Sequence, residues 1–476
     1  MKILPLHPAD NASPDALRAF LAQCREAARR AGRPQLVSIS LAVEALDPLA
    51  VLESIFESTE PHFYAERPST ETAIAGAEVA LRCEAAGPER FATVQRWVTE
   101  TLEHTIAVGD VDAPFGGPHF FAGFGFADDA EPGQPFGPAS VFVPRWQVSL
   151  AGATTTAVAN LVVGPDEAID PLTERVWRAH GKFRRFDYAA PSPAGATVRS
   201  RSRSARQSTE VGDYRAAVAK ALTRIEAGGL NKIVLARARD VEADQPFHPL
   251  EMLNGLRQRF PDCYAFSFTN GRGPSFIGAT PERLVRVSQG VLETEALAGS
   301  AARGQTATED AALGAALARS EKDLREQRQV LDDIVARLSA LGLKPTFPAQ
   351  PQVRRLANVQ HLQTPIRAEL PTQVRLLDVV AAMHPTPAVG GNPRPVAVPL
   401  IRELEGFPRG LYAGALGWMN ARGGGEFFVG IRSALVEGPH ARVYAGAGIV
   451  AGSTPEKEYA ETDLKFRAML DAFGLT

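Results

Sequence analysis

A lysine stands at the beginning of a short apolar run near the middle of the chain. Residues 231–237 read NKIVLAR, in which Lys232 precedes Ile233, Val234 and Leu235. Such a run is typical of a buried strand, where an ammonium group is costly to bury. One explanation is that the stem of Lys232 is buried while its charge reaches the surface. The other is that Lys232 gives up its proton and acts as a base.

Two carboxylates farther along the chain are candidate acids or ligands. Glu282 follows the apolar run of FIGATPERL, where a helix start with Thr280 as cap and Pro281 in the first turn explains it more simply. Glu326 lies in RSEKDLREQRQVLDDIV, near the edge of the apolar face of a predicted helix. A solvated carboxylate is the usual case there, so neither residue gains a role from its own surroundings.

The last predicted helix has two carboxylates and a lysine on one face. Glu458, Glu461 and Lys465 are spaced i, i+3 and i+7, directly after GAGIV, whose backbone N–H groups could bind an anion. Acidic groups from separate helices could hold Mg²⁺, which takes few protein carboxylates and keeps positions for substrate oxygens. The pattern suits a magnesium ion that bridges to an organic carboxylate.

Three further polar residues stand in apolar surroundings. Arg432, in VGIRSALV, interrupts an apolar strand pattern, and a buried arginine requires a carboxylate partner. His361, in NVQHLQTP, and His384, in MHPTPAVGG, are isolated, and an isolated histidine is more often structural than functional. The sequence lacks the P-loop, dinucleotide-binding, HExxH and GxSxG patterns, which argues against those nucleotide-binding and hydrolytic classes.

Helices and hairpins have to position these residues. Periodicity and turn signals predict helices at 14–31, 211–228, 248–258, 308–342, 373–383 and 455–473. Strands are predicted at 36–43, 119–126, 139–150 and 231–241, in hairpins within 263–280 and 284–297, and in a C-terminal antiparallel meander of GLYAGALGWM, EFFVGIRSALV and RVYAGAGIV. Hairpins separated by long helices indicate an α+β fold with mostly antiparallel sheet.

Composition limits the class of protein. The chain has 476 residues, 45% of them hydrophobic, and a net charge of −3, which gives no electrostatic case for nucleic acid or an anionic membrane. Its three cysteines, Cys24, Cys83 and Cys263, have no metal-ligand spacing and fit a reducing cytosol. Neither a secretory signal nor an apolar run of membrane-spanning length is present. These features predict a soluble, cytoplasmic protein.

One segment lacks any apolar period. Residues 189–209, AAPSPAGATVRSRSRSARQST, are predicted to be a mobile linker loop between an N-terminal part, 1–188, and a catalytic region, 210–476. Its arginines could contact phosphates, but a solvated linker is the simpler interpretation; they are Arg199, Arg201, Arg203 and Arg206.

Together, these segments resemble the chorismate-utilising enzymes, which include isochorismate synthase, salicylate synthase and the large subunits of anthranilate and aminodeoxychorismate synthase. The matching segments span about residues 210–475 in family order: NKIVLAR, FIGATPERL, TEALAGSAARG, SEKDLREQ, NVQHL, HPTPAVGGNP, GLYAGALGW, VGIRSA, YAGAGIV and KEYAETDLK. The resemblance implies two mostly antiparallel sheets packed in a sandwich-like core with flanking helices. The first 188 residues, which include FYAERPSTETAIAGAEVA, are expected to add strands to this core.

Two segments favour the isochorismate synthase branch. Ala298, in ALAGS, occupies the place where aminodeoxychorismate synthases have a nucleophilic lysine. His384 and Ala388, in HPTPAVGGNP, match isochorismate synthases and differ from the anthranilate and salicylate synthases. The resemblance thus implies water as the nucleophile, and no glutamine amidotransferase subunit is expected.

The resemblance also implies a mechanism. Neutral Lys232 would take a proton from the water that attacks C2 of chorismate, and protonated Glu282 would donate to the departing C4 hydroxyl. A free lysine has a pKa of about 10.4, whereas an efficient base at neutral pH has one near 7 to 8, so the hypothesis needs burial and a nearby cation to stabilise the neutral amine. Mg²⁺ would be held by Glu326 and Glu461, with Glu458 acting through water.

The remaining implied site residues bind the substrate. Arg432 and Tyr412 would bind the enolpyruvyl carboxylate, and Lys465 the other carboxylate together with backbone amides. The amides are those of Gly446, Ala447 and Gly448, while Gly299, Ser300, His361 and Ala388 would line the ring.

Three alternatives stay open. A salicylate synthase would make isochorismate and then eliminate pyruvate, and a non-catalytic protein would only bind chorismate. Nucleic-acid binding through the Arg-Ser loop would require salt-sensitive retention on DNA. The sequence does not distinguish menaquinone, siderophore and salicylate pathways, and it leaves the oligomeric state open, with a monomer as one option.

Overall fold

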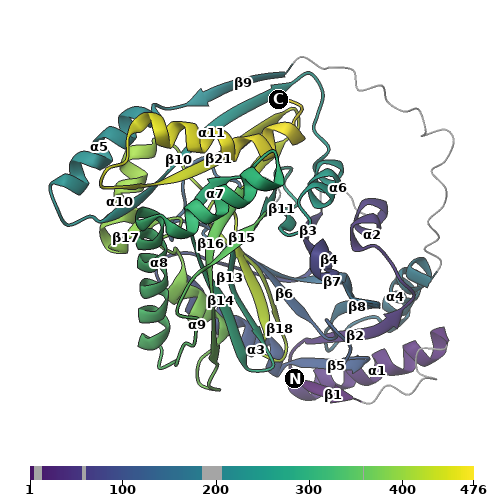
Figure 1. Cartoon of the computed structure of the whole chain (residues 1–476). Helices are drawn as coiled ribbons and strands as arrows, with labels where there is room; N and C mark the ends of the chain where they lie inside the picture. The colour runs from purple at the N-terminus through teal and green to yellow at the C-terminus, as the bar shows by residue number, and fades with distance from the viewer. Residues whose placement is uncertain (5–12, 56–59, 185–205, 357–358, 476) are drawn as a thin grey trace.

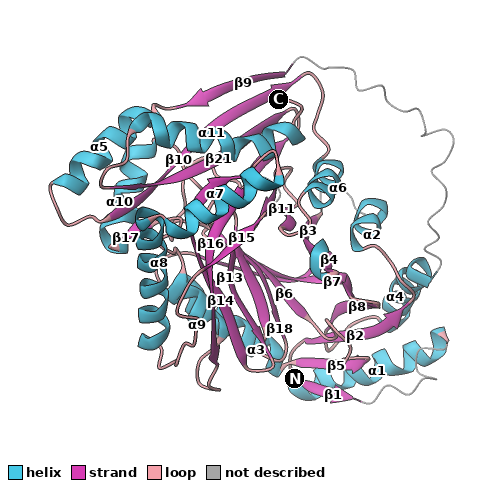
Figure 2. Ribbon diagram, in the orientation of Figure 1, coloured by secondary structure: helices cyan, strands magenta, loops and turns pink. Residues whose placement is uncertain are grey.

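Strands form the centre of the molecule and helices surround them (Figure 2). The computed structural model describes residues 1–4, 13–55, 60–184, 206–356 and 359–475. None of the helices in these ranges is both long and apolar enough to cross a membrane. The helices are α1 Pro14–Ala31, α2 Pro48–Ile55, η2 Pro68–Thr70, α3 Arg90–Glu103, α4 Ile169–Arg184, α5 Tyr214–Glu226, α6 Pro249–Arg259, α7 Ala307–Arg319, α8 Glu321–Ala340, α9 Leu376–Met383, α10 Arg394–Glu405 and α11 Pro455–Ala472.

The strands are numbered in chain order, and Figure 1 labels most of them. They are β1 Lys2–Leu4, β2 Gln35–Val43, β3 Pro61–Arg67, β4 Thr72–Ala85, β5 Thr105–Gly109, β6 His119–Phe124, β7 Ala139–Ala151, β8 Thr154–Val163, β9 Arg206–Val211, β10 Lys232–Ala243, β11 Tyr264–Asn270, β12 Ser275–Thr280, β13 Arg283–Ser288, β14 Val291–Ala302, β15 Gln352–Arg355, β16 Val359–Glu369, β17 Gly391–Asn392, β18 Ala415–Asn420, β19 Gly425–Val429, β20 Ser433–Glu437 and β21 His440–Val450.

These strands pair into one hydrogen-bonded network that divides into two layers. One layer follows the order β15–β16–β14–β13–β19–β18–β6. The other contains β1, β5, β2 and β8 at one end and β3, β11, β12, β20, β21 and β10 at the other. The long strands β4 and β7 belong to both layers, because β7 pairs first with β6 and then with β8. The predicted α+β fold with mostly antiparallel layers is confirmed.

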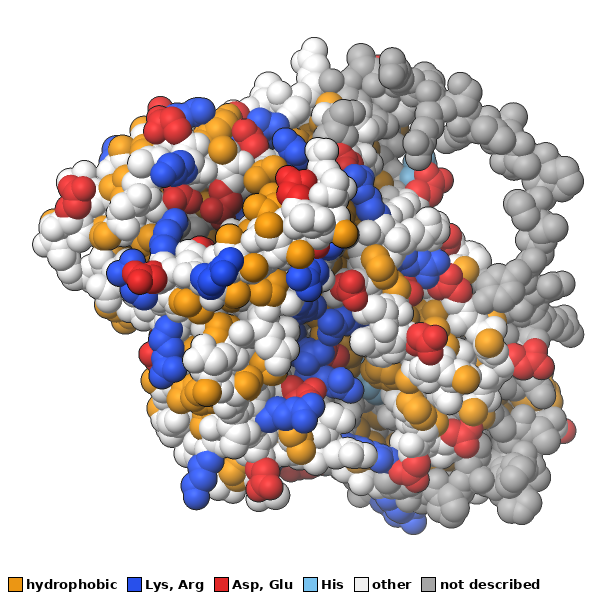
Figure 3. All heavy atoms as spheres, viewed as in Figure 1, with side chains coloured by type: hydrophobic (Ala, Val, Ile, Leu, Met, Phe, Trp, Pro, Cys, Tyr) orange, Lys and Arg blue, Asp and Glu red, His pale blue; other side chains and the backbone are white. Residues whose placement is uncertain are grey.

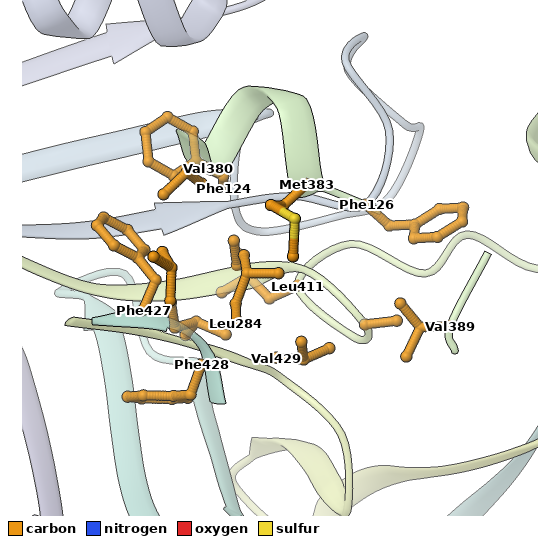
Figure 4. Close-up of a cluster of buried hydrophobic side chains, with 14 of the residues drawn as sticks. Phe124, Phe126, Leu284, Val380, Met383, Val389, Leu411, Phe427, Phe428 and Val429 are labelled. Atoms are coloured by element: carbon orange, nitrogen blue, oxygen red, sulfur yellow. The ribbon is translucent and has the colours of Figure 1, made fainter. Parts of the chain in front are cut away.

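Aromatic side chains fill the space between the layers. Phe63 of β3 stacks on Phe121 of β6 with ring centroids 4.6 Å apart, and Tyr264 of β11 stacks on Phe428 of β19 at 5.2 Å. Each contact joins one layer to the other, and each fully buried Phe side chain contributes about 2 kcal/mol. Figure 4 shows a neighbouring part of the same core, where Met383 of α9 points toward the strands.

Strands from the first 188 residues pair with strands of the C-terminal region at two places. In one layer β6 pairs with β18, and in the other β3 pairs with β11. Of the segment expected to be a loop, residues 189–205 lie outside the described residues, and with them Arg199, Arg201 and Arg203. Residues 206–209, including Arg206, belong to β9, which pairs antiparallel with β10.

The predicted helix at 308–342 is two helices. α7 ends at Arg319 and α8 begins at Glu321, with Ser320 in an extended conformation between them. The hydroxyl of Ser320 accepts a hydrogen bond from the backbone N–H of Asp323 at 3.3 Å, so it caps α8. Because the chain is extended at Ser320, α8 does not continue along the axis of α7.

The predicted three-strand C-terminal meander is wrong in its middle. The run EFFVGIRSALV forms two strands, β19 and β20, which pair with β13 and β12 respectively and not with each other. The chain passes from one layer to the other through residues 430–432. Arg432 has a φ of 51° at this crossing, so it lies between strands and not within one.

Candidate active site

The predicted site residues meet in one cavity of about 180 Å³. β10, β14, β16 and β21 form its walls together with α8 and α11, and Figure 1 shows α11 lying across β10 and β21. The residues that line it include Lys232, Glu282, Gly299, Ser300, Glu326, His361, Ala388, Tyr412, Arg432, Gly446, Gly448, Glu458, Glu461 and Lys465. Ala447, predicted to contribute its backbone amide, is not among the residues that line the cavity. Its side chain is 1% exposed and points away, because neighbours on a strand alternate in direction.

Lys232 enters this cavity from the first position of β10. Its side chain is 3% exposed, and Nζ lies 2.8 Å from Oε1 of Glu326 on α8. The ammonium group therefore does not reach the protein surface. The explanation by a buried stem with a surface-exposed charge is wrong. On the neighbouring strand β21, Gly448 pairs with Val234, and a Cβ added at Gly448 would lie 2.9 Å from Cε of Lys232. Glycine at this position therefore leaves the space that the lysine occupies.

Glu282 lies in the crossing from β12 to β13, and no helix begins there. The helix-start explanation is therefore wrong. The backbone N–H of Glu282 donates to the Thr280 hydroxyl at 3.2 Å, and its carbonyl accepts from Val429 N–H at 3.0 Å. Burial, followed by the charge of Glu295, raises the pKa of Glu282 to about 7, against the opposing effect of Lys232. The structure thus places a carboxyl that holds its proton near neutral pH next to a lysine.

The three carboxylates predicted to hold a metal line the cavity from two helices: Glu326 from α8, and Glu458 and Glu461 from α11. Burial alone would raise the pKa of Glu326, but the charge and hydrogen bond of Lys232 outweigh it and lower that pKa. Lys465, whose Nζ lies 2.6 Å from Oε1 of Glu461, lowers the pKa of Glu461. Burial and the charge of Glu461 raise the pKa of Glu458, although a hydrogen bond from Ser453 opposes them.

The carboxylates have the donor chemistry of a magnesium site. Within the described ranges, no three His, Cys, Asp or Glu side chains converge closely enough to enclose a metal ion. Glu326 and Glu461 instead each bind a lysine. Mg²⁺ prefers oxygen ligands such as carboxylates. It needs only one or two of them from the protein, because water and substrate complete its coordination shell. Glu326, Glu461 and Glu458 therefore have the donor chemistry of a magnesium site, although the three carboxylates do not enclose an ion in the described structure.

Cationic and hydroxyl groups face the carboxylates across the cavity. Within the described part of the chain, the guanidinium of Arg432 forms no hydrogen bond or ion pair, and burial lowers its pKa. Tyr412 stacks on Tyr444 with centroids 4.8 Å apart, and a Cβ at Gly446 would lie 2.8 Å from its hydroxyl. A buried arginine without a partner favours an anionic ligand.

A histidine and a serine form a neutral pair in another wall. His361 Nδ1 lies 2.9 Å from Ser300 Oγ and 3.2 Å from the carbonyl of Gly299, and burial lowers the pKa of His361 to about 3. Because a carbonyl only accepts, we assign the proton to Nδ1, which leaves Nε2 as an acceptor. His384 lies outside the cavity, with Nε2 3.2 Å from the Gly125 carbonyl, so its position is structural.

Two charged residues of the cavity were missed from the sequence. Lys322 and Asp323 line it from the first turn of α8. Lys322 precedes Glu326 by four residues, a spacing that places both on one face of a helix and could have identified it. The missed apolar wall, which has no polar signature, consists of Val234, Leu297, Val389 and Ile431.

A second cavity, of about 390 Å³, contains none of the predicted residues. Its walls include Arg67, Tyr264, Arg283, Arg286 and Glu426. On the face drawn in Figure 3, acidic and basic side chains are interspersed, with basic ones gathered near the middle. The second cavity is larger, but the carboxylate of Glu426 in it already accepts a hydrogen bond from Tyr264 and pairs with Arg283.

Comparisons with known proteins identify the family of this chain. Residues 19–474 match the family model described as chorismate binding enzyme. The chain is 35% identical over 467 residues to the salicylate biosynthesis isochorismate synthase of Pseudomonas aeruginosa, covering 96% of this chain and 94% of that protein. It is 30% identical over 456 residues to the isochorismate synthase MenF of Bacillus subtilis, covering 94% and 95%.

Solved structures show the same relationship. The menaquinone-specific isochorismate synthase MenF from Escherichia coli superposes with a TM-score of 0.76 at 27% identity, over 96% of this chain and 100% of that one. Anthranilate synthase component I from Streptococcus pneumoniae has a TM-score of 0.66 at 22% identity, covering 85% and 93%, and shares the fold. The chain therefore belongs to the family of chorismate-binding enzymes.

Proposed function

We propose that this protein is an isochorismate synthase, which converts chorismate to isochorismate. The observation that carries the proposal is the presence of Lys232 and Glu282 in one cavity with an unpaired Arg432. An acid, a base and an anion-binding group are what hydroxyl exchange on a ring carboxylate requires. The relatives named above as isochorismate synthases, which this chain matches over more than nine-tenths of its length, support the same reaction.

In the proposed reaction, water attacks C2 of chorismate while the C4 hydroxyl departs as water. Lys232 binds Glu326 as an ion pair in this structure, and it has to be a neutral amine in the reaction. It then takes a proton from the attacking water, and Glu282 gives its proton to the departing oxygen. One water is consumed and one released, so the reaction is an isomerisation. The pKa of about 7 for Glu282 supports its role as the acid.

Water is the nucleophile that the cavity favours. At the position where aminodeoxychorismate synthases have a nucleophilic lysine, Ala298 lines the wall with a methyl group. The nearby hydroxyl of Ser300 already contacts His361 at 2.9 Å. Nε2 of the neutral His361 is an acceptor for a substrate hydroxyl.

The substrate's two carboxylates have separate partners in this proposal. Arg432 and Tyr412 would bind the enolpyruvyl carboxylate, and Lys465 with the amides near Gly446 and Gly448 the ring carboxylate. Glu326 and Glu461, with Glu458 acting through water, would hold Mg²⁺, which when bound neutralises and orients the ring carboxylate. All of these residues line the same cavity.

The second candidate is a salicylate synthase, which would carry the same intermediate on to salicylate and pyruvate. The name of the Pseudomonas aeruginosa relative includes salicylate biosynthesis, although it denotes the isochorismate-forming step. Names of other relatives refer to menaquinone and to the siderophore vibriobactin. Genes next to this one would indicate the pathway.

Product analysis tests the proposal. Pure protein is incubated with chorismate and Mg²⁺, and the products are separated by chromatography. We expect isochorismate as the main product, complete loss of activity with EDTA, and a loss of about 10²- to 10⁴-fold for Lys232→Ala. Salicylate and pyruvate as main products would support the second candidate, and chorismate binding without turnover would support a non-catalytic protein.

A further inference from the structure

Both carboxylates proposed to hold the metal are already bound by lysines. Lys232 Nζ lies 2.8 Å from Glu326, and Lys465 Nζ lies 2.6 Å from Glu461. A cation that coordinates these oxygens has to share them with an ammonium or displace it. Even if the metal and the ammonium take different oxygens of one carboxylate, the two positive charges lie close together and repel each other.

The two lysines differ in how readily they can move. Lys232 is 3% exposed and extends from a central strand. Lys465 is 21% exposed and extends from the helix surface four residues after its partner. It also has a second acceptor, because Nζ donates to the carbonyl of Gly446 at 2.8 Å. Lys465 can thus leave Glu461 and keep a hydrogen bond, which makes it the group that exchanges.

We infer that Lys465 competes with the divalent metal for Glu461, and that the substrate relieves this competition by giving Lys465 another carboxylate. This inference rests on the proposed function. Chorismate and Mg²⁺ would then each strengthen binding of the other, because a coupling between two ligands is reciprocal. Couplings of this kind are typically about 5- to 150-fold.

The first experiment measures Mg²⁺ binding to the substrate-free protein by calorimetry. Lys465→Met should bind Mg²⁺ about tenfold more tightly than the parent, because the competing ammonium is gone. Lys465→Arg retains the charge and should not bind more tightly. Lys457→Met is the matched control, since Lys457 is exposed on the same helix and does not line the cavity. Glu461→Gln should bind Mg²⁺ more weakly.

The outcomes separate the inference from the proposals on which it rests. If Glu461→Gln binds Mg²⁺ as tightly as the parent, the metal assignment is wrong. If Glu461→Gln weakens binding but Lys465→Met is no tighter than Lys457→Met, the competition is wrong. Circular dichroism of each variant verifies that it is folded, so that a loss of binding is not a loss of structure.

The second experiment measures the coupling in a Glu282→Gln background, which should bind chorismate without converting it. Chorismate should tighten Mg²⁺ binding about tenfold when Lys465 is present and far less in the Lys465→Met double variant. Chorismate that binds without changing Mg²⁺ affinity would contradict the inference. A protein that does not bind chorismate at all would contradict the proposed function.

Discussion

Glu282 is held where its charged form is unfavourable, and this environment decides how the reaction should respond to pH. Burial is the main cause of its pKa of about 7, and the negative charge of Glu295 adds to it. A carboxyl of ordinary pKa would be ionised at neutral pH and could not donate a proton. The position between two strands thus gives an ordinary side chain the property that the proposed acid needs.

The rate should fall as pH rises through about 7, because Glu282 then loses the proton that it donates. The kcat/KM profile of the parent should show this alkaline limb. Glu282→Gln should be about 10²- to 10⁴-fold slower and should lack the limb. A Gln variant that keeps both the rate and the limb would contradict the assignment.

Glu282 should also make stability depend on pH, in a direction that a surface carboxylate does not. Its pKa is about 7 in the folded state against 4.5 ordinarily, so the folded protein binds more protons between these values. Stability is therefore lost as pH rises through that window. Above pH 7, Glu282→Gln should be more stable than the parent by up to about 3 kcal/mol, and near pH 4 the difference should vanish. Urea unfolding at both pH values measures it, and equal stabilities at high pH would contradict the burial.

Gly448 should be required for the position of Lys232. A methyl group there would lie 2.9 Å from Cε and 3.4 Å from Nζ of Lys232, so Gly448→Ala should displace the amine. A displacement of about 1 Å can cost about 10²-fold in rate. Gly255→Ala, with no atom within 4 Å of the added carbon, is the control and should leave the rate unchanged. An undiminished kcat in Gly448→Ala would show that the position of the lysine is not critical.

The sequence identified most polar residues of the cavity, though not Lys322 and Asp323, and it did not identify which residues pair with each other. Lys232 and Glu326 are 94 positions apart, and only the fold brings them to 2.8 Å. Strand alternation does place the side of Gly446 and Gly448 toward the cavity and the Ala447 side chain away from it, while the predicted role of the Ala447 amide stays a prediction. The surroundings of Glu282 could not be predicted, since the helix start that its neighbours suggested does not form.

At the scale of elements, a buried arginine fixes α11 against β10. Arg237 of β10 is fully buried and binds Glu210 of β9 at 2.9 Å and Asp463 of α11 at 2.8 Å. It also donates to the Thr462 hydroxyl at 2.7 Å and the Tyr459 carbonyl at 3.1 Å. These contacts surround the helical turn that carries Glu458 and Glu461, so they set where the proposed metal ligands lie.

Arg237→Met should therefore destabilise the protein by about 2 kcal/mol, because it removes the hydrogen bonds that this fully buried guanidinium donates to two partly exposed carboxylates, a hydroxyl and a carbonyl. Arg442→Met is the matched control. Its pair with Asp240 at 2.7 Å is partly exposed, and its loss should cost less than about 1 kcal/mol. Urea unfolding of both variants measures the difference, and equal losses would contradict the role of Arg237 in holding α11.

Element boundaries could be predicted where periodicity was uninterrupted. The predicted helix at 14–31 has the bounds of α1, and 455–473 differs from α11 by one residue. The helix pattern at 308–342 continues across Ser320, so the break depends on a single cap. Likewise the apolar run around Arg432 gives no sign that the chain changes layer there.

At the scale of the whole molecule, the site lies where the two layers exchange strands. The chain crosses between layers from β12 to β13 and from β19 to β20, and the two crossings lie side by side, with Ala279 N–H donating to the Arg432 carbonyl at 3.0 Å. Glu282 is on one crossing and Arg432 on the other. The proposed acid and the proposed anion-binding group thus come from the points that join the sandwich together, which no local sequence pattern shows.

The reaction in ¹⁸O-labelled water tests the central claim most directly. The protein is incubated with chorismate and Mg²⁺ in H₂¹⁸O, and the product is analysed by mass spectrometry and NMR. Attack by water at C2 predicts isochorismate that carries one ¹⁸O in its C2 hydroxyl, with Lys232→Ala forming almost none. Isochorismate without the label, or salicylate and pyruvate as the main products, would contradict the account.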